Sequence, residues 1–132
     1  MIIGHERQIA YLERVMREKK MAHAYLLYGP ERVGKLAVAK MIAKYFYCEQ
    51  NSKRSLAGVR DACPACTKIE HNAHQHVFLL DVAHPLVLPK DEEKRTKISI
   101  DDIHELRRMN TLAPEGENWR IIIINDAETM SI

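Results

Sequence analysis

The sequence has 132 residues, a length that fits a single domain. Hydrophobic residues make up 46% and charged residues 29% of it, which is typical of a globular protein and excludes disordered, collagen-like and disulfide-miniprotein chains. Lys and Arg total 20 against 18 Asp and Glu, a net charge of +2 that argues against a nucleic-acid binder held mainly by charge. The longest aliphatic run, Ile121–Ile124, is far shorter than a membrane span of about 20 residues. Residues 1–7 lack the pattern of a signal peptide, so the sequence predicts a cytoplasmic protein without membrane contact.

The N-terminal half predicts two helices separated by a strand. Apolar residues at helical spacing occur within residues 7–20 and again within residues 35–47. These two stripes are Ile9, Leu12, Val15 and Met16, and Val38, Ile42, Tyr45 and Phe46. Between them the apolar run at residues 22–28 predicts a buried strand that ends at Gly29.

The C-terminal half predicts two more strands and two more helices. A short helix capped by Asp61 is expected up to about His71, followed by a strand at residues 77–82. A helix beginning at Ser99 or Asp101 would then turn three apolar residues inward, namely Ile103, Leu106 and Met109. The last strand is expected at residues 120–125. This alternation predicts an α/β fold, a parallel sheet covered by helices on both faces, with about three strands and three to four helices.

A phosphate-binding loop is predicted at residues 29–36, between the first strand and the next helix. The pattern for such a loop is G-x-x-x-x-G-K-[ST], and Gly29, Gly34 and Lys35 fit it. Glycines let backbone N–H groups surround a phosphate, the helix N-terminus adds positive potential, and the lysine reaches the outer phosphates. The candidate nucleotide-binding residues are Gly29, Pro30, Arg32, Val33, Gly34, Lys35 and Leu36.

Two positions depart from this pattern. Leu36 stands where a hydroxyl would bind Mg²⁺, and Glu31 places a negative charge within an anion-binding loop. The sequence therefore leaves open whether ATP or ADP is bound with magnesium.

The last strand ends in Asn125 and Asp126, where phosphate-loop ATPases carry an aspartate for Mg²⁺ and often a glutamate for the attacking water. Asn125 carries no charge, and Ala127 follows Asp126. These positions therefore form a degenerate catalytic motif, and the sequence predicts no ATPase activity of the chain's own.

Three cysteines, Cys48, Cys63 and Cys66, include a C-x2-C pair, a common zinc chelate. A closed zinc site needs a fourth ligand, for which His71 and His74 are the candidates. The alternative is three free thiols beside solvated histidines.

These motifs, in this order, resemble the N-terminal AAA+ domain of bacterial clamp-loader subunits of DNA polymerase III. The likeness is greatest to the delta-prime type and next to gamma/tau, and it covers nearly the whole chain. It rests on residues 3–9, 23–27, 29–35, 98–106 and 125–130 and on the cysteines. The family usually has glycine where this chain has Arg32, a residue that disfavours the positive φ of such a loop.

The resemblance implies a phosphate-loop NTPase fold of AAA+ type over residues 1–132, with a cysteine-containing insertion at about 48–76. It implies that Arg60 replaces one of four zinc-binding cysteines. The family's strand order, 5-1-4-3-2, leads us to expect the N-terminal portion of a longer polypeptide or a truncated gene product, marginal in stability.

The implied function lies in DNA replication. A delta-prime-like subunit would help to load the sliding clamp onto DNA through contacts with other clamp-loader subunits in a hetero-oligomeric ring, and would meet the clamp and primer-template DNA only indirectly. Two alternatives remain open at this point. One is an ATP-hydrolysing gamma/tau-like subunit, and the other is a small zinc-binding protein-interaction module.

Overall fold

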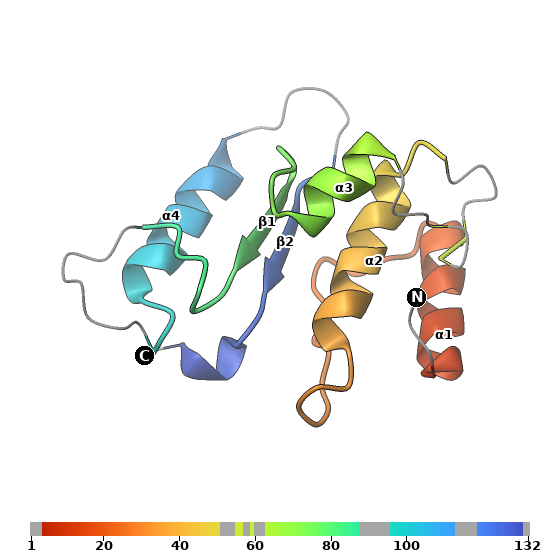
Figure 1. The fold of residues 1–132 in the computed structure, drawn as a ribbon, viewed down its shortest axis with the longest axis horizontal. Helices are drawn as coiled ribbons and strands as arrows, with labels where there is room; N and C mark the ends of the chain where they lie inside the picture. The colour runs from red at the N-terminus through yellow and green to blue at the C-terminus, as the bar shows by residue number, and fades with distance from the viewer. Residues whose placement is uncertain are drawn as a thin grey trace. The chain divides into compact units, whose positions relative to one another are not determined.

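The computed structural model describes residues 4–50, 55–56, 59, 63–87, 96–112 and 119–130. The chain divides into two compact units, Met1–His71 and Asn72–Ile132, whose elements are labelled in Figure 1. Among the described residues, no helix has the length and apolar character needed to cross a membrane.

The first unit contains three helices, α1 (Glu6–Arg17), α2 (Lys35–Tyr47) and α3 (Pro64–Glu70). The apolar stripes predicted for α1 and α2 are confirmed, because they form the core of this unit. Its buried members are Leu12, Met16, Tyr45 and Leu56, and partly buried residues pack against them: Ile9, Met21, Val38, Met41, Ile42, Phe46 and Val59. The two long helices therefore fold as their periodicity predicts.

Helix α3 begins one residue after Cys63, not at the predicted cap. The Cys63 sulfur accepts a hydrogen bond from the backbone N–H of Cys66 and so serves as the N-cap, with Pro64 in the first turn. Asp61, which the sequence suggested as the cap, lies outside the described residues. A thiol thus takes the place usually held by a Ser, Thr, Asp or Asn oxygen.

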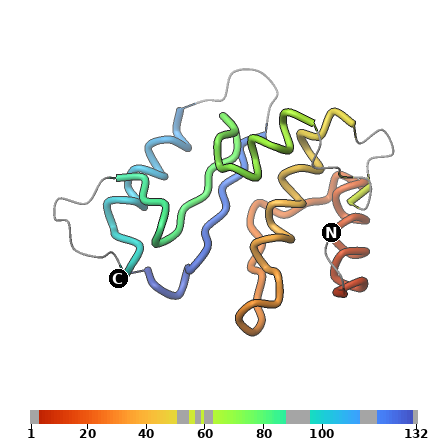
Figure 2. The backbone as a smooth tube through the Cα atoms, in the orientation of Figure 1, coloured from red at the N-terminus to blue at the C-terminus, as the bar shows by residue number. Residues whose placement is uncertain are grey.

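The prediction of a buried strand at residues 22–28 is wrong. This segment has no strand hydrogen bonding, and it runs as irregular chain from α1 to the loop before α2 (Figure 2). Leu26 is 85% exposed and Tyr28 is 94% exposed. A strand forms only where a neighbouring backbone pairs with it, and the sheet formed by the described residues contains only two other segments.

The second unit contains a parallel pair of strands, β1 (Val77–Leu80) and β2 (Ile121–Ile124), in the register Val77 to Ile121 and Leu80 to Ile124. Both strands lie within the ranges predicted for them. Val77, Leu80 and Ile123 are buried. A 3-10 turn, η1 (Ala127–Thr129), follows β2. Among the described residues the protein therefore has two of the three predicted strands, which is compatible with part of an α/β fold.

Helix α4 (Ile100–Thr111) lies between the strands in sequence, and Ser99 is its N-cap. The Ser99 hydroxyl accepts a hydrogen bond from the Asp102 N–H, and the Asp102 carboxylate accepts one from the Ser99 N–H. This reciprocal pair is a capping box. The fully buried Asp102 carboxylate also accepts hydrogen bonds from the backbone N–H groups of Leu86 and Val87. One side chain therefore holds both the helix start and the segment after β1.

Candidate functional site

The predicted phosphate loop is a turn at the start of α2. Gly34 is the N-cap of this helix, with φ 93° and ψ 22°, and Lys35 is its first residue. A side chain at Gly34 would be strained by this positive φ, which explains the glycine. The first N–H groups of a helix have no partner within the helix and can bind an anion. The described geometry thus places free donors and Lys35 at one helix end.

Arg32 adopts the left-handed conformation, with φ 59°. A residue with a Cβ disfavours a positive φ, and Arg32 adopts it nonetheless. The expected cost is about 1–2 kcal/mol for a residue with a Cβ. Arg32 therefore carries backbone strain within this loop.

The Lys35 ammonium is turned back onto the loop. Its Nζ atom donates hydrogen bonds to the carbonyl oxygens of Gly29, at 2.6 Å, and Pro30, at 2.9 Å. A phosphate on this loop would compete for the same donor. Leu36, which is half-buried, offers no oxygen to a metal ion. The loop's own carbonyl oxygens therefore engage Lys35, and position 36 lacks a side-chain ligand for magnesium.

His5 forms a hydrogen bond to this loop that the sequence does not predict. The His5 ring nitrogen Nε2 lies 3.1 Å from the carbonyl oxygen of Val33. Because a carbonyl can only accept, Nε2 is the donor and carries the proton. The residue precedes α1, so this bond joins the start of the chain to the loop. A lone histidine in a polar segment gave no sequence signal for it.

The second predicted pair, Asn125 and Asp126, lies at the carboxyl end of β2. The Asn125 backbone N–H donates to the Leu80 carbonyl at the end of β1. The Asn125 amide Nδ2 donates to the Asp126 carboxylate at 3.4 Å, and Asp126 itself is left-handed with φ 56°. The two side chains thus contact each other.

A buried carboxylate, also not predicted, follows β1. Asp81 accepts hydrogen bonds from the backbone N–H of His84, at 2.7 Å, and from the Nδ1 atom of the same residue, at 2.8 Å. Asp81 is 7% exposed, and the side chain of His84 is 51% exposed. This pair fixes the turn that leaves the strand.

The three cysteines come together in the first unit, as the metal-site prediction requires. Cys48 directly follows α2, Cys63 caps α3, and Cys66 lies in the first turn of α3. Their three sulfur atoms lie within 4.8 Å of one another, and those of Cys48 and Cys63 are 3.9 Å apart. Helices α2 and α3 pack against each other and so bring these sulfurs together.

The environment of the buried cysteines shifts their acidities in opposite directions. Burial raises the pKa of the Cys66 thiol well above its ordinary range, and hydrogen bonding with Cys63 and Cys48 adds to this. Burial also acts to raise the pKa of Cys63, but hydrogen bonds to its sulfur, led by the N–H of Cys66, outweigh burial and lower it. Cys63 is therefore the better-prepared thiolate of the two.

Neither candidate histidine completes this group, which among the described residues consists of the three cysteines alone. His71 is the exposed C-cap of α3, at the opposite end of that helix from Cys63. His74 belongs to the second unit, where its Nδ1 atom accepts a hydrogen bond from the backbone N–H of His76. A fourth protein ligand therefore stays a prediction.

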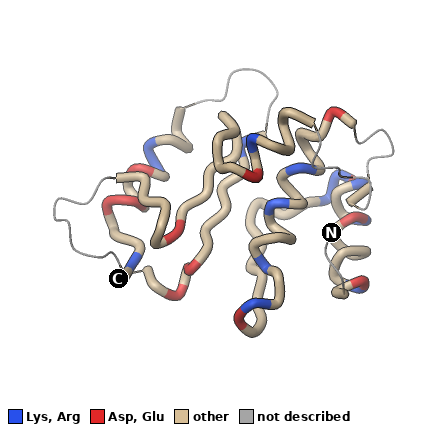
Figure 3. Tube along the Cα trace, viewed as in Figure 1, with Lys and Arg blue, Asp and Glu red and all other residues tan. Residues whose placement is uncertain are grey.

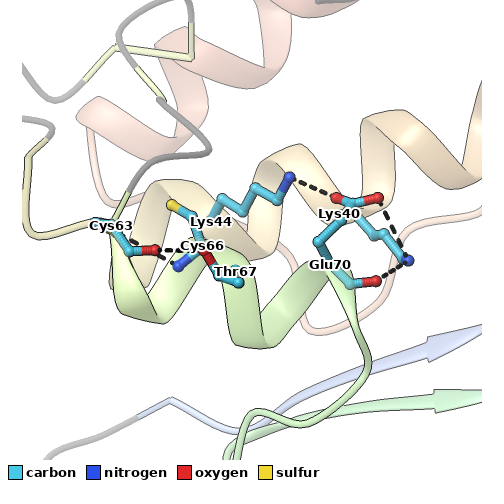
Figure 4. A network of polar contacts seen from close by, with 6 residues as sticks. All are labelled: Lys40, Lys44, Cys63, Cys66, Thr67 and Glu70. Atoms are coloured by element: carbon cyan, nitrogen blue, oxygen red, sulfur yellow. Dashed lines mark hydrogen bonds and ion pairs between the residues drawn. The ribbon is translucent and has the colours of Figure 1, made fainter.

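Charged side chains join α2 and α3 close to the cysteines (Figure 4). The Lys44 Nζ atom lies 2.6 Å from a Glu70 carboxylate oxygen, and Lys40 donates to the Glu70 backbone oxygen at 3.0 Å. The Lys44 side chain is only 7% exposed. Helix α2 carries lysines and no acidic residue, as Figure 3 shows. Glu70 thus links Lys40 and Lys44 of α2 to the end of α3.

The parallel strands, with helix α4 between them in sequence, define an α/β protein. More particularly, the chain belongs to the family described as "DNA polymerase III, delta subunit", whose sequence model matches residues 4–132.

Individual relatives are DNA polymerase III subunits. The chain is 27% identical to subunit tau of Bacillus subtilis over 131 residues, covering 99% of this chain and 21% of that protein. It is 29% identical to subunit delta' of Pseudomonas aeruginosa over 111 residues, covering 84% of this chain and 30% of that protein. Subunit gamma/tau of Mycobacterium tuberculosis is 25% identical over 130 residues, covering 98% and 20%. The chain thus spans less than a third of the length of these relatives. No solved structure matches it.

Proposed function

We propose that residues 1–132 are the N-terminal, AAA+-type part of a delta-prime-like clamp-loader subunit with an insertion at about 48–76. In this role the protein helps to load the sliding clamp onto DNA and does not hydrolyse ATP itself. Membership of the DNA polymerase III delta subunit family supports a clamp-loader role. The relatives are named tau, gamma/tau and delta', so they do not distinguish the type of subunit. The delta-prime type is therefore inferred from the residues of the loop.

The observation that carries this proposal is the side chain at position 36. A magnesium-dependent ATPase of the phosphate-loop class uses a Ser or Thr hydroxyl here as a metal ligand. Leu36 is a hydrocarbon at the second position of α2. A magnesium ion bound here would lack that side-chain ligand, so the transition state for hydrolysis would be less stabilised.

The end of β2 supports the same proposal. Asn125 has no charge with which to hold a metal ion, and Asp126 accepts a hydrogen bond from the Asn125 amide. The subunit then works by binding its neighbours in a hetero-oligomeric ring. It contacts the clamp and primer-template DNA only through them.

An active gamma/tau-like subunit is the second candidate. Gly34 and Lys35 lie at the N-terminus of α2, which supports phosphate binding at this loop. If Asp126 alone binds the metal, weak hydrolysis would follow. A zinc-binding interaction module is a third candidate, supported by the cluster of Cys48, Cys63 and Cys66. Zinc at this cluster is compatible with both clamp-loader roles, and we include it in the proposal.

Calorimetric titration of the chain with Mg-ATP and Mg-ADP tests the proposal, together with phosphate release in the presence of the other clamp-loader subunits. We expect nucleotide affinity that does not depend on magnesium and no phosphate release above that of the other subunits alone. Lys35→Ala is the control for binding at this loop. Magnesium-dependent turnover that Lys35→Ala abolishes would instead establish the gamma/tau-like function.

A further inference from the structure

One hydrogen bond joins the start of α1 to the loop before α2. The Nε2 atom of His5 lies 3.1 Å from the carbonyl oxygen of Val33. His5 is the N-cap of α1, and its own carbonyl accepts a hydrogen bond from the N–H of Ile9 at 2.9 Å. Helix α1 shares a buried cluster with α2, to which Leu12 and Tyr45 belong. The donor is therefore held by a packed helix and not by the loop itself.

This bond sets the direction of the peptide unit between Val33 and Gly34. A peptide unit is planar and trans, so a carbonyl that points toward His5 makes the N–H of Gly34 point the opposite way. Gly34 has φ 93° and no Cβ, so this unit could rotate at small steric cost if nothing held the carbonyl. Rotation would put a carbonyl, which repels anions, where the N–H now lies. The His5 bond therefore favours one of these two orientations.

Lys35 makes a different kind of contact with this loop. Its ammonium donates to the carbonyl oxygens of Gly29 and Pro30, and an anion would draw it away from them. The donor of the His5 bond belongs to another element, so this bond can persist when Lys35 turns to an anion. The orientation of the backbone at Val33 would then depend on His5.

We propose that His5 is a positioning residue for anion binding at residues 29–36. Its Nε2–H holds the Val33 carbonyl toward α1, which keeps the N–H of Gly34 available to a phosphate group of a nucleotide. This inference rests on the nucleotide affinity expected under the proposed function and adds to it a residue outside the loop. An anion that favours this orientation strengthens the His5 bond to the same degree, so occupancy of the loop is coupled to the start of α1.

Calorimetric titration of the whole chain with ADP tests the positioning role in two matched variants. His5→Gln keeps a side-chain N–H donor, and His5→Met has the length of glutamine without a donor. ADP affinity should stay within about twofold of the parent in His5→Gln and fall by about three- to tenfold in His5→Met, the effect of one hydrogen bond on an equilibrium. Equal affinities in the parent and both variants would overturn the role. Equal losses in the two variants would also overturn it, because the donor would then not matter.

Amide hydrogen exchange in the parent chain tests the coupling without a substitution. ADP should slow exchange of the Ile9 N–H, which is bonded to His5, and leave that of the Glu18 N–H at the other end of α1 unchanged. Exchange at Ile9 that does not respond to bound ADP would overturn the coupling and leave the proposed function standing. Absence of ADP binding that depends on Lys35, judged with Lys35→Ala, would overturn nucleotide binding at this loop and the role of His5 together.

Discussion

Replacing Arg32 by glycine should stabilise the protein, because the left-handed backbone at this position penalises any side chain. Arg32 has φ 59° and an exposed side chain. Removing the Cβ recovers about 1–2 kcal/mol of strain. Glycine also gives the unfolded chain more freedom, which costs about 0.5–1 kcal/mol. The balance is a gain of about 0.75 kcal/mol in the free energy of unfolding, within limits of about 0 and 1.5 kcal/mol.

Urea unfolding followed by circular dichroism measures this gain as a shift of the midpoint at constant slope. For a chain of this size, a gain of this magnitude corresponds to a rise in Tm of roughly 2–4 °C. Arg32→Ala is the matched control, since it removes the same guanidinium but keeps the Cβ, and it should give no gain. If Arg32→Gly is no more stable than Arg32→Ala, the strain argument fails.

A second site in the same unit checks the reasoning independently. Lys19 follows α1 with φ 55°, where the N–H of Lys19 bonds to Met16 and that of Lys20 bonds to Val15. These two bonds form the helix-ending motif in which glycine is usual. Lys19→Gly should therefore give a gain similar to that of Arg32→Gly, away from the loop.

Three further predictions concern single side chains. Leu36→Thr supplies a magnesium ligand, so it should tighten binding of Mg-ATP relative to ATP alone by roughly tenfold, as measured by calorimetry. Leu36→Val has the shape of threonine without the oxygen and should not tighten binding of Mg-ATP. Asp102→Ala should lower the free energy of unfolding by about 3 kcal/mol, measured in urea, because buried N–H groups lose their acceptor. The control Asp101→Ala changes an exposed residue and should lower it by less than about 1 kcal/mol. Equal losses in the two variants would contradict this account. Burial raises the pKa of Cys66, and its thiol must lose a proton to bind zinc. Zinc affinity should therefore rise with pH, by about tenfold per pH unit for each proton released. A competition titration whose zinc affinity does not change with pH would exclude thiolate binding.

The helices could be predicted from the sequence because their determinants are local. The stripe that includes Leu12 and Met16 lies on one face of α1, and Ser99 begins α4 through a bond to a residue three positions later. The parallel strands were also predicted, since their runs of Val, Ile and Leu are both apolar and β-forming. In each case the pattern and the structure concern the same few residues.

The segment at residues 22–28 shows where this reasoning fails. Its run of Ala, Leu and Tyr is apolar enough for a buried strand, but burial depends on a pairing backbone and on a covering layer. Neither is encoded in the segment itself, and Leu26 and Tyr28 are exposed. The cap of α3 was missed for a different reason. Sulfur is a weak acceptor, and Cys63 acts as a cap because its sulfur, fixed within the cluster, receives the N–H of Cys66.

In the loop at residues 29–36, phosphate binding and magnesium binding depend on different atoms, although a single sequence motif describes both. A phosphate would be held here by backbone N–H groups, the helix end and Lys35, and these depend on the turn at Gly34. Magnesium depends on one hydroxyl, and Leu36 lacks it. Because different atoms carry the two functions, a single side-chain change can remove hydrolysis while the loop keeps its shape. We therefore expect nucleotide affinity and turnover to be lost independently. The magnesium dependence of ATP affinity in Leu36→Thr, compared with that of the parent chain, measures how much of the magnesium binding depends on this one side chain.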